Sequence, residues 1–191
     1  MYLQHIGLLK VKWHRPLQGK IKTISMKREA GDWYVIFSCD LGEVEVEPST
    51  HPPVGIDLGL KAFLMTNEGE EVKPPKCYRK AQKALRRAQR KVARRKKGSK
   101  RRKKAVRLLQ KQHQHIANQR RNFHHQTARS LVNRYGMVVH EDLNISGIAQ
   151  TRLAKATHDV GWAGFLAVLK HKAEEAGVTV IAVPPHNTTQ M

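Results

Sequence analysis

Three acidic side chains at the ends of two short apolar segments are the best candidates for chemistry. Asp57 ends the segment Val54-Gly-Ile-Asp57 and lies between Gly55 and Gly59, while Glu141 and Asp142 follow Met137-Val-Val-His140. Glycine next to a carboxylate allows a metal ion or a phosphate to come close to the backbone. If both segments are strands and lie side by side, their ends bring Asp57 together with Glu141 or Asp142.

Carboxylates gathered in this way suit metal-dependent cleavage of a phosphodiester. That reaction uses two metal ions about 3.5–4 Å apart, held by shared carboxylates. Mg²⁺ is the expected ion because it prefers hard oxygen ligands. A plain alternative stays open, in which Asp57 is a solvated cap and the acids form structural salt bridges.

The positive charge of the chain points to nucleic acid. The net charge is +21 and the pI is about 10.4, and 24 of the 36 Lys and Arg residues lie between Val72 and His140, where there is no Asp or Glu. Such a block attracts phosphate backbones, and binding should fall steeply with salt. We expect backbone or shape recognition, with few stacking sites because aromatic residues make up 6% of the chain. The predicted nucleic-acid-binding residues are Arg86, Arg87, Arg90, Lys91, Arg94, Arg95, Lys96, Lys97, Lys100, Arg101, Arg102, Lys103, Arg120 and Arg121.

Other classes of protein fit the sequence less well. No apolar run is long enough to span a bilayer and the N-terminus does not have the composition of a signal peptide, so we expect a soluble, cytoplasmic protein. The two cysteines, Cys39 and Cys77, support neither a disulfide framework nor a zinc site. His113 and His115 do not share a helix face, and neither do His124 and His125. All four are predicted to be polar residues on a helix surface.

The elements that must position these groups can be read from periodicity. Residues 21–27 and 33–39 are typical of strands joined by a turn, and the alternation of Val and Glu over residues 43–47 favours a third strand. Three prolines within residues 47–53 then predict a boundary between a small β domain, 1–50, and a second domain, 51–191.

The second domain is predicted to be a mixed α/β sheet with a long inserted helical hairpin. Three short strands between residues 54 and 73 favour an antiparallel meander, and helical spacing then begins at Tyr78. A second helix of roughly 33 residues would be about 50 Å long and end at Gly136. The remaining elements are a strand from Met137, a helix with Trp162 as an apolar anchor and Gly177 as its stop, and a strand at 178–183.

Several motifs in this order and spacing resemble the TnpB proteins of insertion sequences. They are Val54-Gly-Ile-Asp57-Leu-Gly-Leu60, Lys96-Lys-Gly-Ser-Lys100, Ile116-Ala-Asn-Gln-Arg120 with Phe123-His124, Glu141-Asp142-Leu-Asn144, and Gly161-Trp162. The resemblance covers essentially the whole chain. It implies an RNase H-like RuvC domain, interrupted by the hairpin at about residues 78–135 and preceded by part of a wedge-type β-barrel.

The resemblance also implies an RNA-guided, Mg²⁺-dependent DNA endonuclease, named a transposase by kinship. Asp57 would be its first catalytic, metal-binding carboxylate and Glu141 the second, with DNA and a guide-type RNA as partners. The family pattern continues beyond a segment like Val183-Pro-Pro-His-Asn-Thr-Thr-Gln190 into a zinc ribbon and a third catalytic Asp, whereas this sequence stops at Met191.

We therefore expect a member truncated at both ends that lacks zinc, holds Mg²⁺ weakly and cleaves poorly. Two alternatives remain: a nuclease-dead RNA- or DNA-binding module or regulator, and a basic protein of ribosomal type, which would leave Asp57 and Glu141 unexplained.

Overall fold

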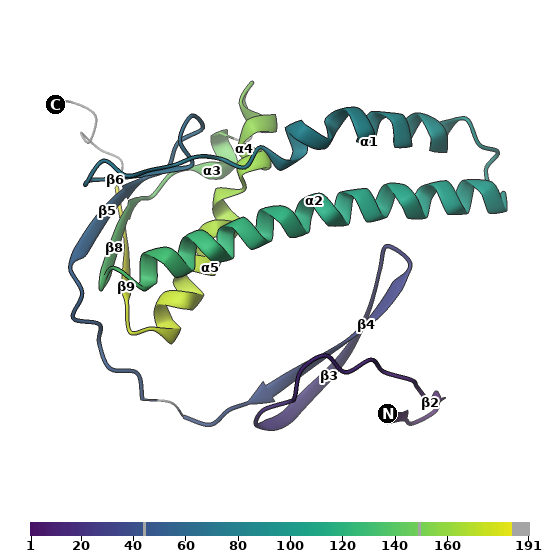
Figure 1. Cartoon of the computed structure of the whole chain (residues 1–191), viewed down its shortest axis with the longest axis horizontal. Coiled ribbons are helices and arrows are strands. Elements are labelled where there is room, and N and C mark those ends of the chain that lie inside the picture. Colours follow the sequence, from purple (N-terminus) through teal and green to yellow (C-terminus); the bar gives the residue numbers. More distant parts are fainter. Residues whose placement is uncertain (44, 149, 185–191) are drawn as a thin grey trace. The chain divides into compact units, whose positions relative to one another are not determined.

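The chain folds into two compact units, Met1–Glu45 and Val46–Met191. The computed structural model describes residues 1–184 except Val44 and Ala149 (Figure 1). The part of the predicted strand at Val44 and the segment from Pro185 to Gln190 lie outside the described residues. The sequence predicted a boundary at residue 50, and the two units separate five residues earlier.

The first unit is built on a long antiparallel hairpin. Strands β3 (Lys20–Glu29) and β4 (Asp32–Asp40) pair along their length, as predicted, and the turn uses Ala30 and Gly31, both at positive φ. Two short strands, β1 (Tyr2–Leu3) and β2 (Gly7–Leu8), also pair antiparallel. The strand predicted at 43–47 is wrong for its described residues, which belong to no strand. Alternation alone forms no strand without a partner, and Pro48 follows immediately.

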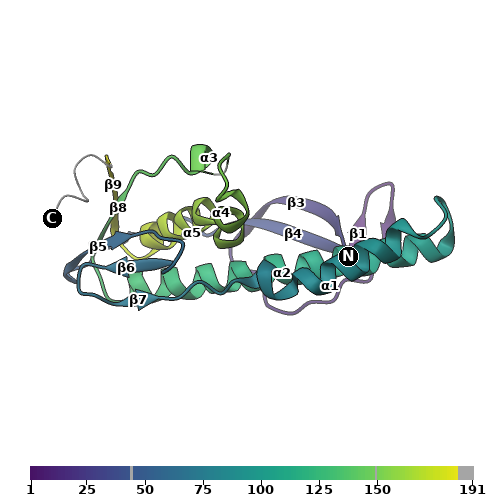
Figure 2. The same cartoon turned by 90° about the horizontal axis from the view of Figure 1, so that it is seen from above.

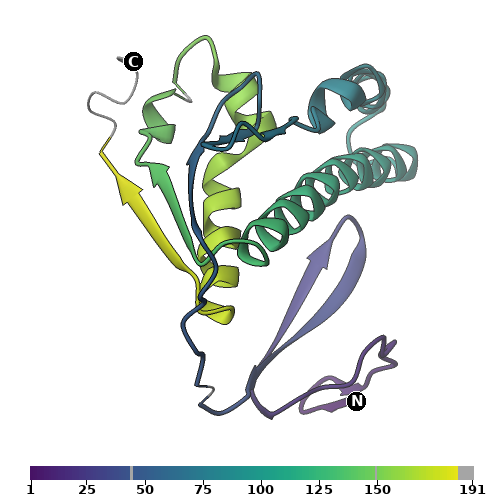
Figure 3. The same ribbon diagram turned by 60° about the vertical axis from the view of Figure 1, so that its left-hand side comes forward.

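The second unit contains a mixed five-stranded sheet (Figure 3). Its strands are β5 (Pro53–Asp57), β6 (Leu64–Thr66), β7 (Glu71–Val72), β8 (Met137–Glu141) and β9 (Thr179–Val183). Their order across the sheet is β7-β6-β5-β8-β9. The first three form the predicted antiparallel meander, whereas β5, β8 and β9 run parallel to one another. The parallel strands therefore end at the same edge.

Two long helices leave the sheet between β7 and β8 and return to it (Figures 1 and 2). They are α1 (Cys77–Ala93) and α2 (Lys100–Val132), the second having the predicted 33 residues. Cys77, Leu85 and Ile116 form a small core between them. Ser99 caps α2 by accepting a hydrogen bond from the Arg102 N–H at 3.2 Å.

The end of α2 differs from the prediction. The helix ends at Val132, and Gly136 instead donates its N–H to the Pro52 carbonyl at 3.0 Å. A side chain at position 136 would meet the His51 carbonyl oxygen at 2.5 Å. Glycine is therefore required here by the close passage of residues 49–52, and the helix ends without it.

Three further helices complete the second unit: α3 (Ile145–Ile148), α4 (Ala154–Val160) and α5 (Trp162–Glu175). As predicted, Trp162 is a buried anchor, and Gly177, at φ 67°, follows the end of α5. None of the helices in the described part of the chain is long and apolar enough to cross a membrane.

The core lies on one face of the sheet. Val54, Ile56 and Val138 pack with residues of α2 and α5, among them Leu131 and Phe165. Because side chains alternate along a strand, the intervening residues of β5 and β8 point to the opposite face. Asp57 and Glu141 are among these intervening residues, so the burial of their neighbours fixes the side of the sheet on which they lie.

Candidate functional site

Asp57 and Glu141 lie next to each other at one edge of the sheet. Strands β5 and β8 are parallel neighbours whose register pairs Ile56 with His140, and Asp57 and Glu141 are the next residues along each strand. Neighbouring strands are about 4.8 Å apart. Asp57 is exposed and Glu141 half-buried. The predicted meeting of the two strand ends is therefore confirmed.

Asp142 does not share this position. It lies just beyond the end of β8, is exposed, and its N–H donates to the Val183 carbonyl at 2.8 Å. The ladder that β8 forms with β9 thus continues through the Asp142 backbone. Of the two neighbouring acids, Glu141 is the one that occupies the position beside Asp57 in the sheet.

Two carboxylates on one face provide hard oxygen ligands of the kind that Mg²⁺ binds. The described residues contain no group of three or more His, Cys, Asp or Glu side chains arranged to hold a metal ion. The residues present therefore fit a single ion held by Asp57 and Glu141, with water as its remaining ligands, which is a common way to bind Mg²⁺.

His140 is a residue of the site that the sequence interpretation missed. It points into the core, where 3% of its surface is exposed, and its Nδ1–H donates to the Glu141 carbonyl at 2.8 Å. Its Nε2 is buried and has no hydrogen-bond partner among the described residues. The imidazole therefore fixes the backbone at Glu141 and hence the start of that side chain. The only signal in the sequence was its position directly before Glu141.

The predicted phosphate-binding residues lie on α1, α2 and the turn between them. Those that are exposed are Arg86, Arg87, Arg90, Lys91, Arg94, Lys96, Lys97, Lys100, Arg101, Lys103 and Arg121. Five basic residues in the last turns of α1 and directly after it line one cavity of about 490 Å³: Arg87, Arg90, Lys91, Arg94 and Arg95. Positions three, four and seven residues apart share one helix face, so this cavity is a concentrated cationic surface suited to an anion.

Two of the predicted residues bind the chain itself. Arg102 donates from Nη1 to the carbonyls of Val92 and Arg95, at 2.9 and 3.2 Å, and so closes the end of the hairpin. Arg120 donates from Nη1 to the His158 carbonyl at 2.7 Å. Both side chains are half-buried. Each guanidinium therefore has a structural contact in addition to its charge.

Asp159, on α4, holds the start of α1. Its two carboxylate oxygens accept hydrogen bonds from the backbone N–H groups of Tyr78 and Arg79, at 2.8 and 3.2 Å. The residue at the N-cap of α1, Lys76, has a left-handed backbone and supplies no side-chain cap. Asp159 thus satisfies helix donors that have no local partner. The only sign of this contact in the sequence was indirect: no Ser, Thr, Asp or Asn directly precedes the helix.

His124 is not the polar surface residue that we predicted. It is 4% exposed, its ring lies 5.7 Å from that of Phe63 and 5.9 Å from that of Phe165, and its Nε2 bonds the Val160 carbonyl at 2.9 Å. Burial lowers its pKa below the ordinary value. Helical spacing placed His124 on α2 correctly, but the packing of α5 covers its face. The other three histidines, at 113, 115 and 125, are exposed as predicted.

The chain is similar to proteins of one kind. A family model, OrfB_IS605, described as "Probable transposase", matches residues 36–152. "Putative RNA-guided DNA endonuclease InsQ" of Escherichia coli (strain K12) is 29% identical over 209 residues, covering 100% of this chain and 51% of the relative. "Putative RNA-guided DNA endonuclease" of Streptomyces pristinaespiralis is 32% identical over 179 residues, covering 92% of this chain and 44% of the relative. The chain therefore spans about half the length of these relatives.

A solved structure shares the fold. It is titled "Cryo-EM structure of the Cas12f1-sgRNA-target DNA complex", with a TM-score of 0.50 and 17% sequence identity, and the match covers 83% of this chain and 33% of that one. At this identity the likeness concerns the fold alone. The family model, however, matches residues 36–152, which is more than half of the chain. The chain belongs to the OrfB_IS605 family, the TnpB-type proteins of insertion sequences.

Proposed function

We propose that this chain is the nucleic-acid-binding and metal-binding part of a transposon-encoded, RNA-guided DNA endonuclease with an RNase H-like, RuvC-type sheet. The observation that carries the proposal is the register of β5 and β8, which makes Asp57 and Glu141 neighbours on one face. The strand order β7-β6-β5-β8-β9, with an antiparallel meander beside parallel strands, supports it.

The proposed catalytic residues are Asp57 and Glu141, which would hold Mg²⁺. When bound, such an ion polarises phosphoryl oxygens and lowers the pKa of coordinated water. The chain positions these ligands through the sheet: the β5–β8 ladder sets the spacing of the two residues, and His140 fixes the Glu141 backbone. Two carboxylates without a cation would repel the phosphates of a nucleic acid. A bound metal ion would therefore also allow the nucleic-acid backbone to approach the site.

The proposed partners are DNA and a guide-type RNA, bound through α1 and α2. The cationic cavity on α1 and the exposed basic residues at the tip of the hairpin support this assignment. Contacts with phosphates carry no sequence information by themselves. Recognition by these helices should therefore depend on backbone charge and shape, with target sequence read by base pairing to a guide.

A second candidate function is binding without efficient cleavage. The described residues bring two carboxylates to the edge of the sheet, whereas a two-metal mechanism shares several carboxylates between its ions. We infer that the polypeptide of 191 residues binds nucleic acid and cleaves it slowly, if no other chain supplies a ligand.

The test compares cleavage and binding in the same preparations. Purified wild type, Asp57→Ala and the control Glu174→Ala, an exposed acid of α5, are incubated with supercoiled plasmid in Mg²⁺ or EDTA. We expect little nicking by any of them, and binding to labelled DNA and RNA that weakens with salt in all three. If wild type nicks the plasmid robustly in Mg²⁺ and Asp57→Ala does not, the inference of slow cleavage is wrong. The same result would support Asp57 as a catalytic residue. If binding does not depend on the salt concentration, the assignment of nucleic-acid binding to the basic residues of α1 and α2 is wrong.

A further inference from the structure

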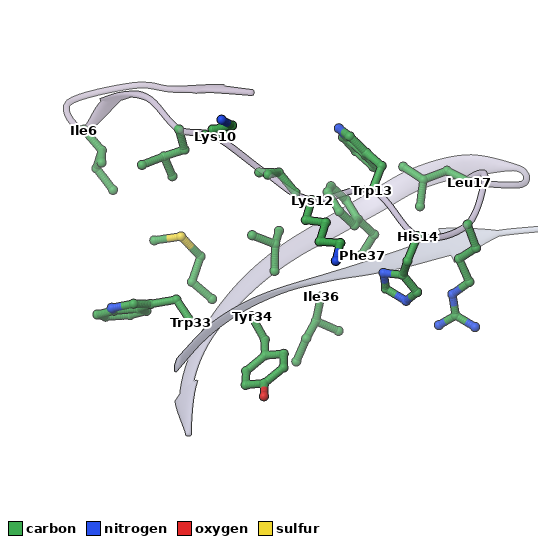
Figure 4. A pocket seen from close by; sticks show the side chains of 15 residues that line it. Ile6, Lys10, Lys12, Trp13, His14, Leu17, Trp33, Tyr34, Ile36 and Phe37 are labelled. Carbon is green, nitrogen blue, oxygen red and sulfur yellow. The ribbon is translucent and has the colours of Figure 1, made fainter. Parts of the chain in front are cut away.

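A groove in the first unit combines aromatic and cationic side chains. It has a volume of about 720 Å³ and is bordered by the N-terminal segment from Ile6 to Leu17 and by the hairpin of β3 and β4 (Figure 4). None of its lining residues is acidic. In the sequence, the first acidic residue is Glu29, so the whole N-terminal segment carries only positive charge.

The aromatic rings of this groove are exposed to an unusual degree. Trp33 is 66% exposed, Trp13 55% and Tyr34 44%, whereas the third tryptophan, Trp162, is 3% exposed in the core of the second unit. Trp13 stacks on Phe37, with the ring centroids 5.4 Å apart and the planes inclined by 21°. Phe37 thus supports the Trp13 indole from one side, while more than half of the Trp13 surface stays exposed.

Cations lie around these rings. Lys10, Lys12, His14 and Arg15 line the same groove and are all exposed, and Figure 4 labels the first three among the lining side chains. The Arg28 guanidinium lies 5.7 Å from the centroid of the Trp33 ring. An aromatic face flanked by lysine and arginine is the combination that holds single-stranded nucleic acid, in which bases stack on the rings and cations follow the backbone.

We propose that this groove binds unpaired nucleobases of a single-stranded nucleic acid, which stack on Trp13 and Trp33 while Lys10, Lys12 and Arg15 contact the phosphates. The site shares no residue with Asp57, Glu141 or α1, so it is a separate site; it rests on the proposed function and deepens it by adding a surface for unpaired strands. Aromatic residues make up only 6% of the whole chain, which is why few stacking sites were expected. The fold gathers five of its eleven aromatic residues in the first unit.

The groove favours this occupant over others. An apolar peptide would bury the rings but leave the four cationic residues without a use. A duplex would satisfy the cations, but its bases are already stacked on each other and cannot reach the indoles. An unpaired strand offers both a flat apolar ring and a negative charge at every nucleotide.

The test separates stacking from charge by comparing strands that carry bases with a strand of the same length and charge that lacks them. The full chain is titrated with oligothymidylate, oligouridylate and an abasic strand of the same length and charge. We expect the strands with bases to bind roughly 5- to 150-fold more tightly for each stacked base and to quench tryptophan fluorescence. The comparison of the first two probes shows whether DNA or RNA is preferred.

Variants then assign the effect to the rings. Trp13→Leu and Trp33→Leu should reduce the ratio of affinities for the base-bearing and abasic strands, whereas Trp33→Tyr should retain most of it. Tyr2→Leu is the control, because Tyr2 is an equally exposed aromatic residue of the same unit that does not line the groove. Binding of the abasic strand should change little in any of these variants.

Equal affinity of wild type for abasic and base-bearing strands would overturn the proposal, and the groove would then be a surface for an apolar partner. The proposal also fails if Tyr2→Leu reduces the ratio as much as the tryptophan variants do. If a leucine variant does not fold, the ratio and the fluorescence quenching in wild type still decide the question. If the strands with and without bases bind equally but binding still weakens with salt, the proposal for the groove is wrong and the function proposed for α1 and α2 is not affected.

Discussion

At the scale of single residues, Asp57 and Glu141 are two acids that directly follow the paired residues Ile56 and His140 of neighbouring parallel strands. Carboxylate oxygens are the hard ligands that Mg²⁺ prefers. One ion can therefore be shared by two carboxylates that start from neighbouring strands. On this ground we propose that the pair binds a divalent metal ion.

His124 is a second residue whose surroundings make a measurable prediction. Burial among aromatic rings lowers its pKa, and the Val160 carbonyl offsets this only in part. Just below the ordinary pKa of 6.5, the unfolded chain therefore binds more protons than the folded one. The free energy of unfolding should fall as the pH falls through 6.5, with a slope of up to about 1.4 kcal/mol per pH unit, until the lower folded-state pKa is passed.

Urea unfolding at a series of pH values measures this slope. His124→Gln removes the titration and keeps a donor for the Val160 carbonyl, so its unfolding free energy should vary less with pH in this window than that of wild type. His125→Gln, at the exposed neighbouring position, should keep the wild-type slope. The same slope in His124→Gln and wild type would show that His124 is not the group that titrates.

At the scale of elements, Asp159 connects α4 to the start of α1. Replacing an N-cap acid by Ala typically costs about 0.5–2 kcal/mol, and we expect Asp159→Ala to lower the unfolding free energy by that amount. Hydrogen exchange should accelerate most at the amides of Tyr78 and Arg79, which lose their acceptor. Asp159→Asn should lose less, because Asn also caps helices. Unchanged exchange at both amides in Asp159→Ala would contradict this role.

The sequence predicted those structural features that are determined by residues within a single segment of the chain. The strand ends at Asp57 and Glu141, the hairpin of β3 and β4 and the length of α2 all follow from alternation, turns or helical spacing along one segment. Asp159 could not be predicted as a cap, because its partners are about 80 residues away in the chain. His124 was misjudged for the same reason, since the ring of Phe165 that covers it belongs to a different helix.

Residues 43–47 show the opposite error. Their alternation of apolar and acidic residues is a valid local pattern, but a strand also needs a neighbour to complete its hydrogen bonds. The candidate site was predicted to the level of its two carboxylates. The residues alone left Glu141 and Asp142 open, and only the resemblance to the TnpB proteins favoured Glu141. The register of β8 makes Glu141 the residue next to Asp57.

At the scale of the whole molecule, binding should report the charge on one face of α1. Each phosphate contact contributes about −0.9 to the slope of log K against log salt for double-stranded DNA. Arg87→Gln, Arg90→Gln and Arg94→Gln together should therefore make the slope shallower by roughly 2–3. Electrophoretic mobility shifts over a range of salt concentrations measure it.

The control removes the same charge from scattered exposed positions outside α1 and α2, using Lys61→Gln, Lys73→Gln and Lys170→Gln. We expect a much smaller change of slope for this variant. If both triple variants change the slope equally, net charge rather than the cationic cavity on α1 governs the affinity, and the assignment of that cavity is wrong.

A single metal ion held jointly by Asp57 of β5 and Glu141 of β8 is the central feature of the proposed site. The direct measurement is binding of Mn²⁺, as a stand-in for Mg²⁺, followed by electron paramagnetic resonance for wild type, Asp57→Asn, Glu141→Gln and the control Glu174→Gln. We predict that either replacement at the site weakens Mn²⁺ binding by at least about tenfold. Mutating a group that only hydrogen-bonds to a metal ligand typically costs about 10- to 100-fold in metal affinity, and losing a ligand itself should cost no less. The control should bind as wild type does. If Asp57→Asn and Glu141→Gln bind Mn²⁺ as tightly as wild type, or wild type binds none, the two carboxylates do not form a metal site.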